Sequence, residues 1–207
     1  MHNIVDLIVI GAGPAGLMTA KRAAELGLKV TIIELKKDIT NVKRACSSQF
    51  VTDEGYQNET IKIDNNKIIF TKNKFHINYT GPLLNIINNY HHSPSGHKLH
   101  LSHPDHRPFA IKFDKGHLLA DLWRDCEKLG VTLLLETVAY RGKDLGDHVR
   151  VDIRNHKNIS YILGKKLVVA EGANAKLTGL FGLNKGHVLH GTPLVFSCIV
   201  EGVTGFE

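Results

Sequence analysis

The sequence predicts an α/β fold in which a parallel sheet is combined with a β-meander and an inserted β-rich segment. The first observation behind this prediction is a strand–helix–strand pattern. An apolar, β-branched run at 4–10 is followed by a helical pattern at 14–27 and by a second apolar run at 29–34. The second observation is the alternation of polar and apolar residues at 148–154, which is typical of a hairpin strand with one buried face.

The remaining elements follow from similar patterns. Residues 36–50 show no periodicity and predict a loop, and residues 51–112 contain short strand-like pieces with a turn at 93–97. Asp114 is a suitable N-cap for a helix that extends to Leu129, because apolar residues recur there at helical spacing. Further strands are expected at 131–135, 159–163, 166–170 and 192–200.

These elements predict one domain at 1–190, with the β-rich insertion at about 51–112, and the start of a second domain at 191–207. The meander, from 147 to 163, is expected to pack over the parallel sheet. The strand at 192–200 would leave an open sheet edge, which a partner chain or a second copy of this chain would cover.

Composition excludes several classes of protein. The three cysteines, Cys46, Cys126 and Cys198, are widely spaced and odd in number, which argues against a disulfide framework and favours a reducing compartment, the cytoplasm. No apolar run is long enough for a transmembrane helix, and the N-terminus lacks the basic leader of a signal peptide. The formal charge of +6 is spread along the chain, so nucleic acid is not an expected partner.

The turn after the first strand has the pattern G-x-G-x-x-G, from Gly11 to Gly16. In this pattern Gly11 permits a tight turn, Gly13 lets the backbone approach a pyrophosphate, and Gly16 lets the helix pack closely. The helix N-terminus then presents unpaired N–H groups to the diphosphate. Glu34 ends the second strand and can accept hydrogen bonds from a ribose diol. The unit is therefore predicted to be a Rossmann-like dinucleotide-binding element, and Glu34 argues against a 2′-phosphate.

Longer motifs continue this pattern. Gly16 is followed by x-x-x-Ala20, and three segments accompany it: KRACSSQF at 43–50, FDKGHLLADLWRDCEKLGVTLLLETVA at 113–139 and KKLVVAEGANAKLTGLFGL at 165–183. With these motifs the chain resembles FAD-dependent oxidoreductases of the geranylgeranyl reductase and flavin monooxygenase superfamily. The resemblance implies an FAD-binding domain at 1–190, a small-molecule or lipid substrate of unknown identity, and NAD(P)H as a candidate reductant.

The resemblance also implies a set of site residues. Glu34 would hold the AMP ribose, the Val138 backbone would contact adenine, and Cys46 would lie near the flavin ring as a candidate catalytic residue. No metal site is expected. The full set implied to contact the cofactor is Gly11, Gly13, Pro14, Ala15, Gly16, Glu34, Leu35, Ala45, Cys46, Ser48, Lys112, Val138, Gly172 and Ala173.

Several alternatives stay open. Cys46 is either a thiol beside the flavin or an unreactive loop cysteine, since reactivity needs an electropositive and partly exposed site. The motif at 170–175 has Glu171 and Ala175 where the superfamily carries Asp and Ser, which weakens any nicotinamide role for it. Histidines are frequent between 91 and 117 and indicate a polar hairpin rather than a zinc site. The rival functions are a non-catalytic FAD- or ADP-binding subunit and an NAD-binding domain.

Overall fold

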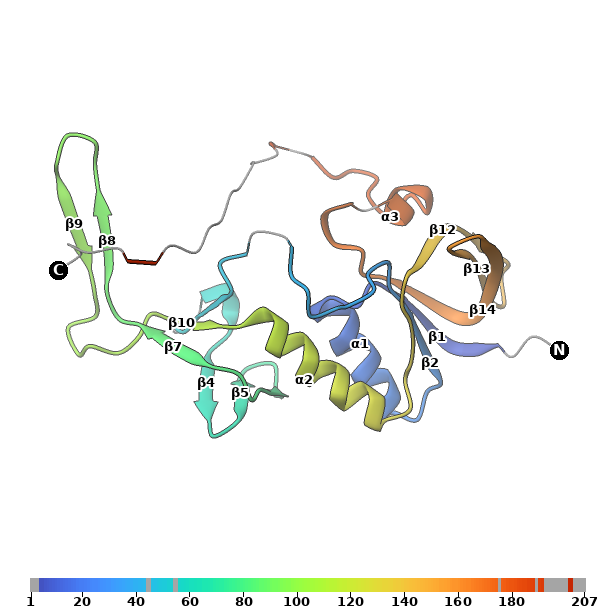
Figure 1. Cartoon of the computed structure of the whole chain (residues 1–207), viewed down its shortest axis with the longest axis horizontal. Helices are drawn as coiled ribbons and strands as arrows, with labels where there is room; N and C mark the ends of the chain where they lie inside the picture. Colours follow the sequence, from blue (N-terminus) through green and yellow to red (C-terminus); the bar gives the residue numbers. More distant parts are fainter. Residues whose placement is uncertain are drawn as a thin grey trace.

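The computed structural model describes residues 4–43, 46–53, 56–174, 176–188, 190–191 and 201–202. Its centre is a sheet with strand order β11-β2-β1-β14-β13-β12 (Figure 1). The first four of these strands run parallel to one another. They are β11 (Thr132–Leu134), β2 (Val30–Ile33), β1 (Val5–Ile10) and the second half of β14 (Asn158–Val169). The α/β class and the strand–helix–strand unit are therefore confirmed. The strand expected at 192–200 lies outside the described residues.

The β-meander consists of β12 (Thr137–Asp144), β13 (Val149–Asn155) and the first half of β14. It therefore begins at Thr137, ten residues before the predicted start at 147, because β12 was not recognised as a strand. The two strands expected at 159–163 and 166–170 are one continuous strand. β14 changes partner at Gly164, which lies opposite Val149 of β13 and also opposite Val5 of β1. One strand thus belongs to both layers.

Two apolar cores result from this arrangement, one on each face of the parallel sheet. Leu7 and Val9 of β1 point toward the helices α1 (Pro14–Glu25) and α2 (Lys115–Lys128). Ile8 and Ile10, which alternate with them, pack against the meander. The meander side chains in that second core include Val151 and Ile153, so the meander packs over the sheet as predicted.

Both helices begin and end close to the predicted residues. Asp114 is the N-cap of α2, and its carboxylate accepts a hydrogen bond from the His117 N–H at 2.7 Å. The Cys126 thiol is buried in the core, where burial raises its pKa to about 11. No described helix is long and apolar enough to cross a membrane.

The segment between β2 and α2 is β-rich, as expected. One sheet has the order β3-β10-β7, a second has the order β4-β5-β6, and β8 pairs with β9 as a separate hairpin. A turn at 93–97 joins the last pair, as the sequence predicts. The bounds are β3 (Gln49–Val51), η1 (Tyr56–Asn58), β4 (Ile61–Asp64), β5 (Lys67–Phe70), β6 (Phe75–Asn78), β7 (Leu83–Ile86), β8 (Asn89–His92), β9 (Lys98–Leu101) and β10 (Ala110–Phe113). After β14 come η2 (Gly172–Asn174) and α3 (Lys176–Leu180).

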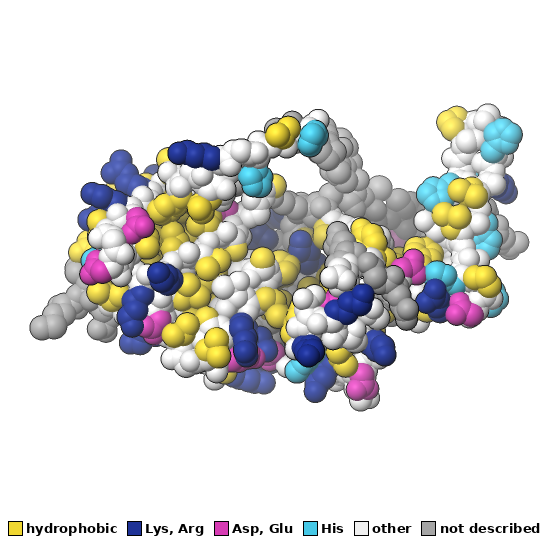
Figure 2. Space-filling model, turned by 180° about the vertical axis from the view of Figure 1, so that it is seen from behind, with side chains coloured by type: hydrophobic (Ala, Val, Ile, Leu, Met, Phe, Trp, Pro, Cys, Tyr) yellow, Lys and Arg dark blue, Asp and Glu magenta, His cyan; other side chains and the backbone are white. Residues whose placement is uncertain are grey.

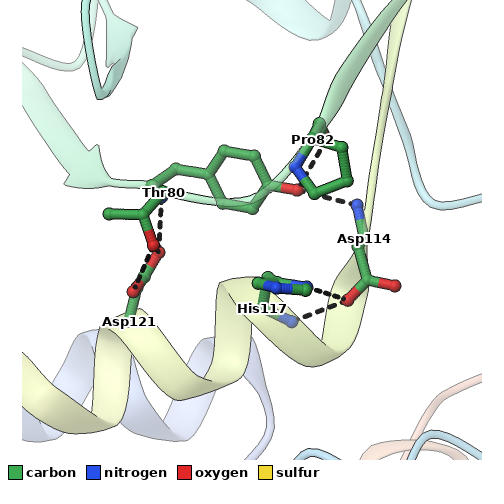
Figure 3. Close-up of polar contacts among 6 residues, drawn as sticks. Thr80, Pro82, Asp114, His117 and Asp121 are labelled. Atoms are coloured by element: carbon green, nitrogen blue, oxygen red, sulfur yellow. Dashed lines mark hydrogen bonds and ion pairs between the residues drawn. The ribbon is translucent and has the colours of Figure 1, made fainter.

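Side chains at the first turns of α2 hold the β6–β7 connection in place (Figure 3). The buried Asp121 carboxylate accepts hydrogen bonds from the Thr80 N–H at 2.6 Å and from the Thr80 hydroxyl. The Tyr79 hydroxyl donates to the Pro82 carbonyl and accepts from the Asp114 N–H, both at 2.8 Å. This polar clamp fixes the inserted segment to the helix that covers the parallel sheet.

The partner change at Gly164 yields a stability prediction. A Cβ at this position would lie 2.7 Å from Cγ1 of Ile8, which is completely buried. We therefore expect Gly164→Ala to lower the free energy of unfolding by about 1–3 kcal/mol, because Ile8 must move within a packed core. Denaturant titration measures the change. Gly179→Ala is the control, since a Cβ there meets only an ordinary contact in α3, and an equal loss in both variants would contradict the prediction.

Candidate functional site

The glycine-rich turn lies at the carboxyl edge of the parallel sheet, between β1 and α1. Gly11 has φ +98°, and a Cβ on it would lie 2.5 Å from the carbonyl oxygen of Ala170. A Cβ on Gly16 would overlap the carbonyl oxygen of Gly11. Both positions therefore require glycine for reasons internal to the fold: the turn at Gly11 and the close approach of α1 at Gly16.

Gly13 differs from these two glycines because no atom of the described residues lies against it. It is the N-cap of α1 with φ −75°, so it does not need the left-handed conformation, and a Cβ on it would meet no atom within 4 Å. The first turn of α1 contains Pro14 and Ala15, no acidic residue and no side-chain cap. The N–H groups of this turn have no partners within the helix and face a space that an anion can enter.

Glu34 follows β2 directly and lies against the glycine-rich turn. One oxygen of its carboxylate accepts a hydrogen bond from the Ala12 N–H at 2.7 Å, and the other accepts from the Lys36 N–H at 2.8 Å. Because a carboxylate has about four acceptor positions, both oxygens keep capacity for a ribose diol. Leu35, the next residue, is exposed beside it.

The start of β12 lies next to this carboxylate. The Thr137 N–H donates to the Glu34 carbonyl at 2.9 Å, and the Glu136 N–H donates to the Lys36 carbonyl at 3.1 Å. Val138 comes immediately after these two contacts. The structure thus brings Val138 beside the end of β2, although the two segments are far apart in sequence.

β14 ends at the same edge of the sheet. The Ala170 N–H donates to the Ile10 carbonyl at 2.8 Å, and Gly172, with φ +69°, begins the 3₁₀ turn that contains Ala173. The Glu171 carboxylate accepts a hydrogen bond from the Leu177 N–H at 2.8 Å. Glu171 therefore has a local structural role, which is to hold the N-terminal turn of α3.

Cys46 and Ser48 belong to the loop that precedes β3, and Ala45 lies outside the described residues. The Cys46 thiol is exposed. Partial burial would raise its pKa, but hydrogen bonds from Ser48 and the positive charge of Lys115 outweigh burial, so the pKa of Cys46 lies below its ordinary value. Lys115 is the first residue of α2, and sequence reasoning missed it as a neighbour of Cys46.

Lys112 is placed differently from the other predicted residues. It lies on β10, between Gln49 of β3 and Leu84 of β7, and is exposed. The β3-β10-β7 sheet belongs to the inserted segment, and a contact of Lys112 with the cofactor stays a prediction.

Away from this edge, the described residues form a hollow but no metal site. A shallow hollow of about 460 Å³ on the β4–β6 sheet is lined by residues between 64 and 76, none of which was predicted for the site. Within the described ranges, no three His, Cys, Asp or Glu side chains are close enough to share a metal ion. Instead, His103 pairs with Asp53 at 2.6 Å, and His117 pairs with Asp114 at 3.0 Å.

The residues at this edge fit the ADP half of FAD. The open approach at Gly13 suits a diphosphate, the uncapped α1 N-terminus suits its negative charge, and the Glu34 carboxylate stands where a ribose diol can donate to it. Thr137 and Val138 supply backbone beside that position.

Comparison with known proteins agrees with this geometry. A family model described as pyridine nucleotide-disulphide oxidoreductase matches residues 5–194. Digeranylgeranylglycerophospholipid reductase from Methanosarcina acetivorans is 41% identical over 68 residues, which are 33% of this chain and 16% of that protein. A second reductase of this name, from Methanosphaera stadtmanae, is 48% identical over 52 residues, 25% of this chain and 12% of that protein.

Solved structures show the same fold. A geranylgeranyl bacteriochlorophyll reductase-like protein from Thermoplasma acidophilum has a TM-score of 0.67 at 18% identity, over 91% of this chain and 44% of that one. p-Nitrophenol 4-monooxygenase from Pseudomonas putida has a TM-score of 0.63 at 14% identity, over 88% of this chain and 44% of that one. The chain therefore spans less than half the length of these solved structures.

The open space at Gly13 leads to a first prediction about binding. We expect Gly13→Val to fold normally but to lose FAD binding, because its side chain fills the space of the diphosphate while its Cβ meets no described atom within 4 Å. Gly16→Val should instead fail to fold, since its Cβ overlaps the Gly11 carbonyl. Circular dichroism and FAD titration separate the two effects, and a Gly13→Val variant that binds FAD at full affinity would exclude this turn as the phosphate site.

A second prediction concerns Glu34. We expect Glu34→Gln to weaken the binding of both FAD and ADP by about 1–3 kcal/mol, through loss of charge-assisted hydrogen bonds to the ribose. Calorimetric titration with each ligand measures this. Glu127→Gln, an exposed position on α2, is the control. If FAD binding weakened while ADP binding did not, Glu34 would not contact the AMP half.

A third prediction concerns the thiol. Lys115→Gln should raise the pKa of Cys46 and slow its alkylation by iodoacetamide at neutral pH by about two- to fivefold, because the thiolate loses a nearby positive charge. Mass spectrometry of the Cys46 peptide gives the rate for this residue alone. Lys62→Gln, on β4, is the control. Equal rates in all three proteins would show that Lys115 does not influence the thiol.

Proposed function

Since the chain belongs to the pyridine nucleotide-disulphide oxidoreductase family, we propose that it binds FAD at the carboxyl edge of its parallel sheet. We further propose that it is the cofactor-binding part of an FAD-dependent reductase that acts on a lipid with geranylgeranyl chains. The chemistry supplied by FAD, when bound, is two-electron transfer. The protein contributes the binding, the orientation and the electrostatic environment of the cofactor.

One observation carries this proposal: the Ala12–Glu34 hydrogen bond beside the open approach at Gly13. This bond fixes the carboxylate relative to the α1 N-terminus, so one rigid unit offers N–H donors to a diphosphate and acceptors to a ribose. A 2′-phosphate in place of the ribose hydroxyl would bring its negative charge against Glu34, which disfavours NADP here. NAD(P)H remains the reductant to test first, at a separate position.

The choice of a reductase over a monooxygenase rests on sequence. The curated relatives that match over the cofactor-binding part are named digeranylgeranylglycerophospholipid reductases, with identities of 41% and 48%. The monooxygenase likeness is one of fold, at 14% identity. A geranylgeranyl lipid is therefore the proposed substrate class.

Cys46 has a subsidiary place in the proposal. Its thiol is exposed, and Lys115 and Ser48 stabilise its charged form. A thiol whose charged form is stabilised in this way can exchange a proton with a neighbouring group. We assign it the role of a proton-exchanging group at the edge of the site.

A second candidate function is a non-catalytic FAD- or ADP-binding subunit. The observation in its favour is that the described residues at this edge fit the ADP half of FAD, which is the part that such a subunit needs to bind. Such a subunit would bind ADP and FAD through the same residues but would show no turnover.

The function is tested with the 207-residue chain loaded with FAD under anaerobic conditions. We expect reduction by NADH, NADPH or dithionite, followed by reoxidation on addition of a geranylgeranyl phospholipid. Mass spectrometry should show a gain of about two mass units for each double bond reduced, since each takes up two hydrogens. The Gly13→Val variant is the control. Flavin that binds but is never reoxidised by the lipid would favour the non-catalytic subunit, and oxygen-dependent hydroxylation of an aromatic compound would favour a monooxygenase.

A further inference from the structure

The β8–β9 hairpin projects from the body of the protein. Its two strands contact mainly each other, and Figure 1 shows the pair extending away from the sheet and helices. All but the first residue of β8, and every residue of β9, are exposed. An isolated two-stranded hairpin is marginally stable in water, so a surface that covers this arm would stabilise it.

The arm carries large apolar side chains in contact with solvent. Leu99 is 54% exposed, Leu101 is 46% exposed and Tyr90 is 55% exposed. Leu99 and Leu101 lie two residues apart on β9 and therefore share one face of the hairpin. Tyr90 lies on the opposite face, stacked on the His100 ring at a centroid distance of 4.4 Å. Apolar side chains therefore line both faces of the arm.

The arm has basic side chains and no acidic ones. No Asp or Glu occurs in the sequence from 65 to 104, a stretch that includes the whole hairpin. At the base of the arm, Asp105 lies 3.6 Å from Arg107 and Asp53 pairs with His103. The basic residues of the hairpin and its turn are His91, His92, His97, Lys98 and His100. In Figure 2 the arm shows hydrophobic and His side chains close together.

We propose that this hairpin docks on an anionic phospholipid surface, with Leu99 and Leu101 in the interface and the basic side chains on the headgroups. Exposed apolar side chains beside cations are the combination that binds such interfaces. A second copy of the chain would bring the same positive charge against the hairpin. A nucleic acid would leave the leucines without an apolar environment.

The lipid chemistry of this surface rests on the proposed function, whose relatives are named as reductases of a glycerophospholipid. A protein that acts on such a lipid gains from contact with the bilayer that holds it. Vesicle binding requires neither flavin nor turnover. This inference can therefore fail while the proposed function stands, and the proposed function can fail while this inference stands.

The test is sedimentation of the 207-residue chain with vesicles of phosphatidylglycerol and phosphatidylcholine, and with vesicles of phosphatidylcholine alone. We expect binding to the anionic vesicles only. Leu99→Ser combined with Leu101→Ser should weaken it by about tenfold or more, which corresponds to about 1.4 kcal/mol. The matched control is Ile159→Ser with Leu183→Ser, at positions 70% and 63% exposed, which should change binding less than about twofold.

A second pair of variants tests the charge. His92→Gln with Lys98→Gln should weaken binding, and Lys143→Gln with His156→Gln, which removes the same residue types from the meander, should not. Equal effects of the two pairs would show that general basic charge, and not the hairpin, attracts the vesicles, and would overturn the proposal.

Direct insertion is measured by fluorescence, which does not depend on comparing affinities. Leu99→Trp should be quenched by vesicles of brominated phosphatidylglycerol and phosphatidylcholine, beyond the quenching of the parent chain with its single Trp123. Ile159→Trp should show no extra quenching. Absence of quenching at 99, dimerisation that requires Leu99 and Leu101, or binding to RNA in place of vesicles would each overturn the assignment.

Discussion

The close approach of Gly16 to the carbonyl of Gly11 is the constraint on which the candidate site depends. It presses the first turn of α1 against the end of β1, and this position leaves the helix N-terminus open toward solvent beside Gly13. The same approach places Ala12 where its N–H reaches the Glu34 carboxylate. The proposed phosphate donors and the proposed ribose acceptor therefore occupy one rigid unit, whose geometry is set by a backbone contact and not by the ligand.

The second constraint is that β14 belongs to two layers. Its first half completes the meander and its second half completes the parallel sheet, so the apolar core on each side is built partly from one strand. This sharing also brings the end of β14, with Ala170 and Gly172, beside the glycine-rich turn. The meander is thus tied to the edge that forms the site, although it supplies few of the site's side chains.

The sequence was sufficient where the pattern was local. The strand–helix–strand unit and the α2 N-cap Asp114 follow from apolar spacing and capping chemistry. β12 was missed because its pairing is irregular between Ala139 and Arg141, which breaks the alternation. The single strand β14 was divided because Gly164 resembles a break in sequence. In the structure, the missing Cβ of Gly164 leaves room for the side chain of Ile8. The Lys115–Cys46 contact joins distant segments, and no spacing rule predicts such a pair.

The pairing of β1 with β14 has a consequence for synthesis of the chain. Val5 lies opposite Gly164, so β1 gains this neighbour only after the chain has been translated as far as β14. At a synthesis rate of about 5–20 residues per second, one edge of β1 stays unpaired for on the order of ten seconds or more, and β2 is its only available partner strand in that time. A nascent chain with such an edge is a natural client for ribosome-associated chaperones. Its rate of folding is then set by the arrival of β14 and not by the early glycine-rich unit.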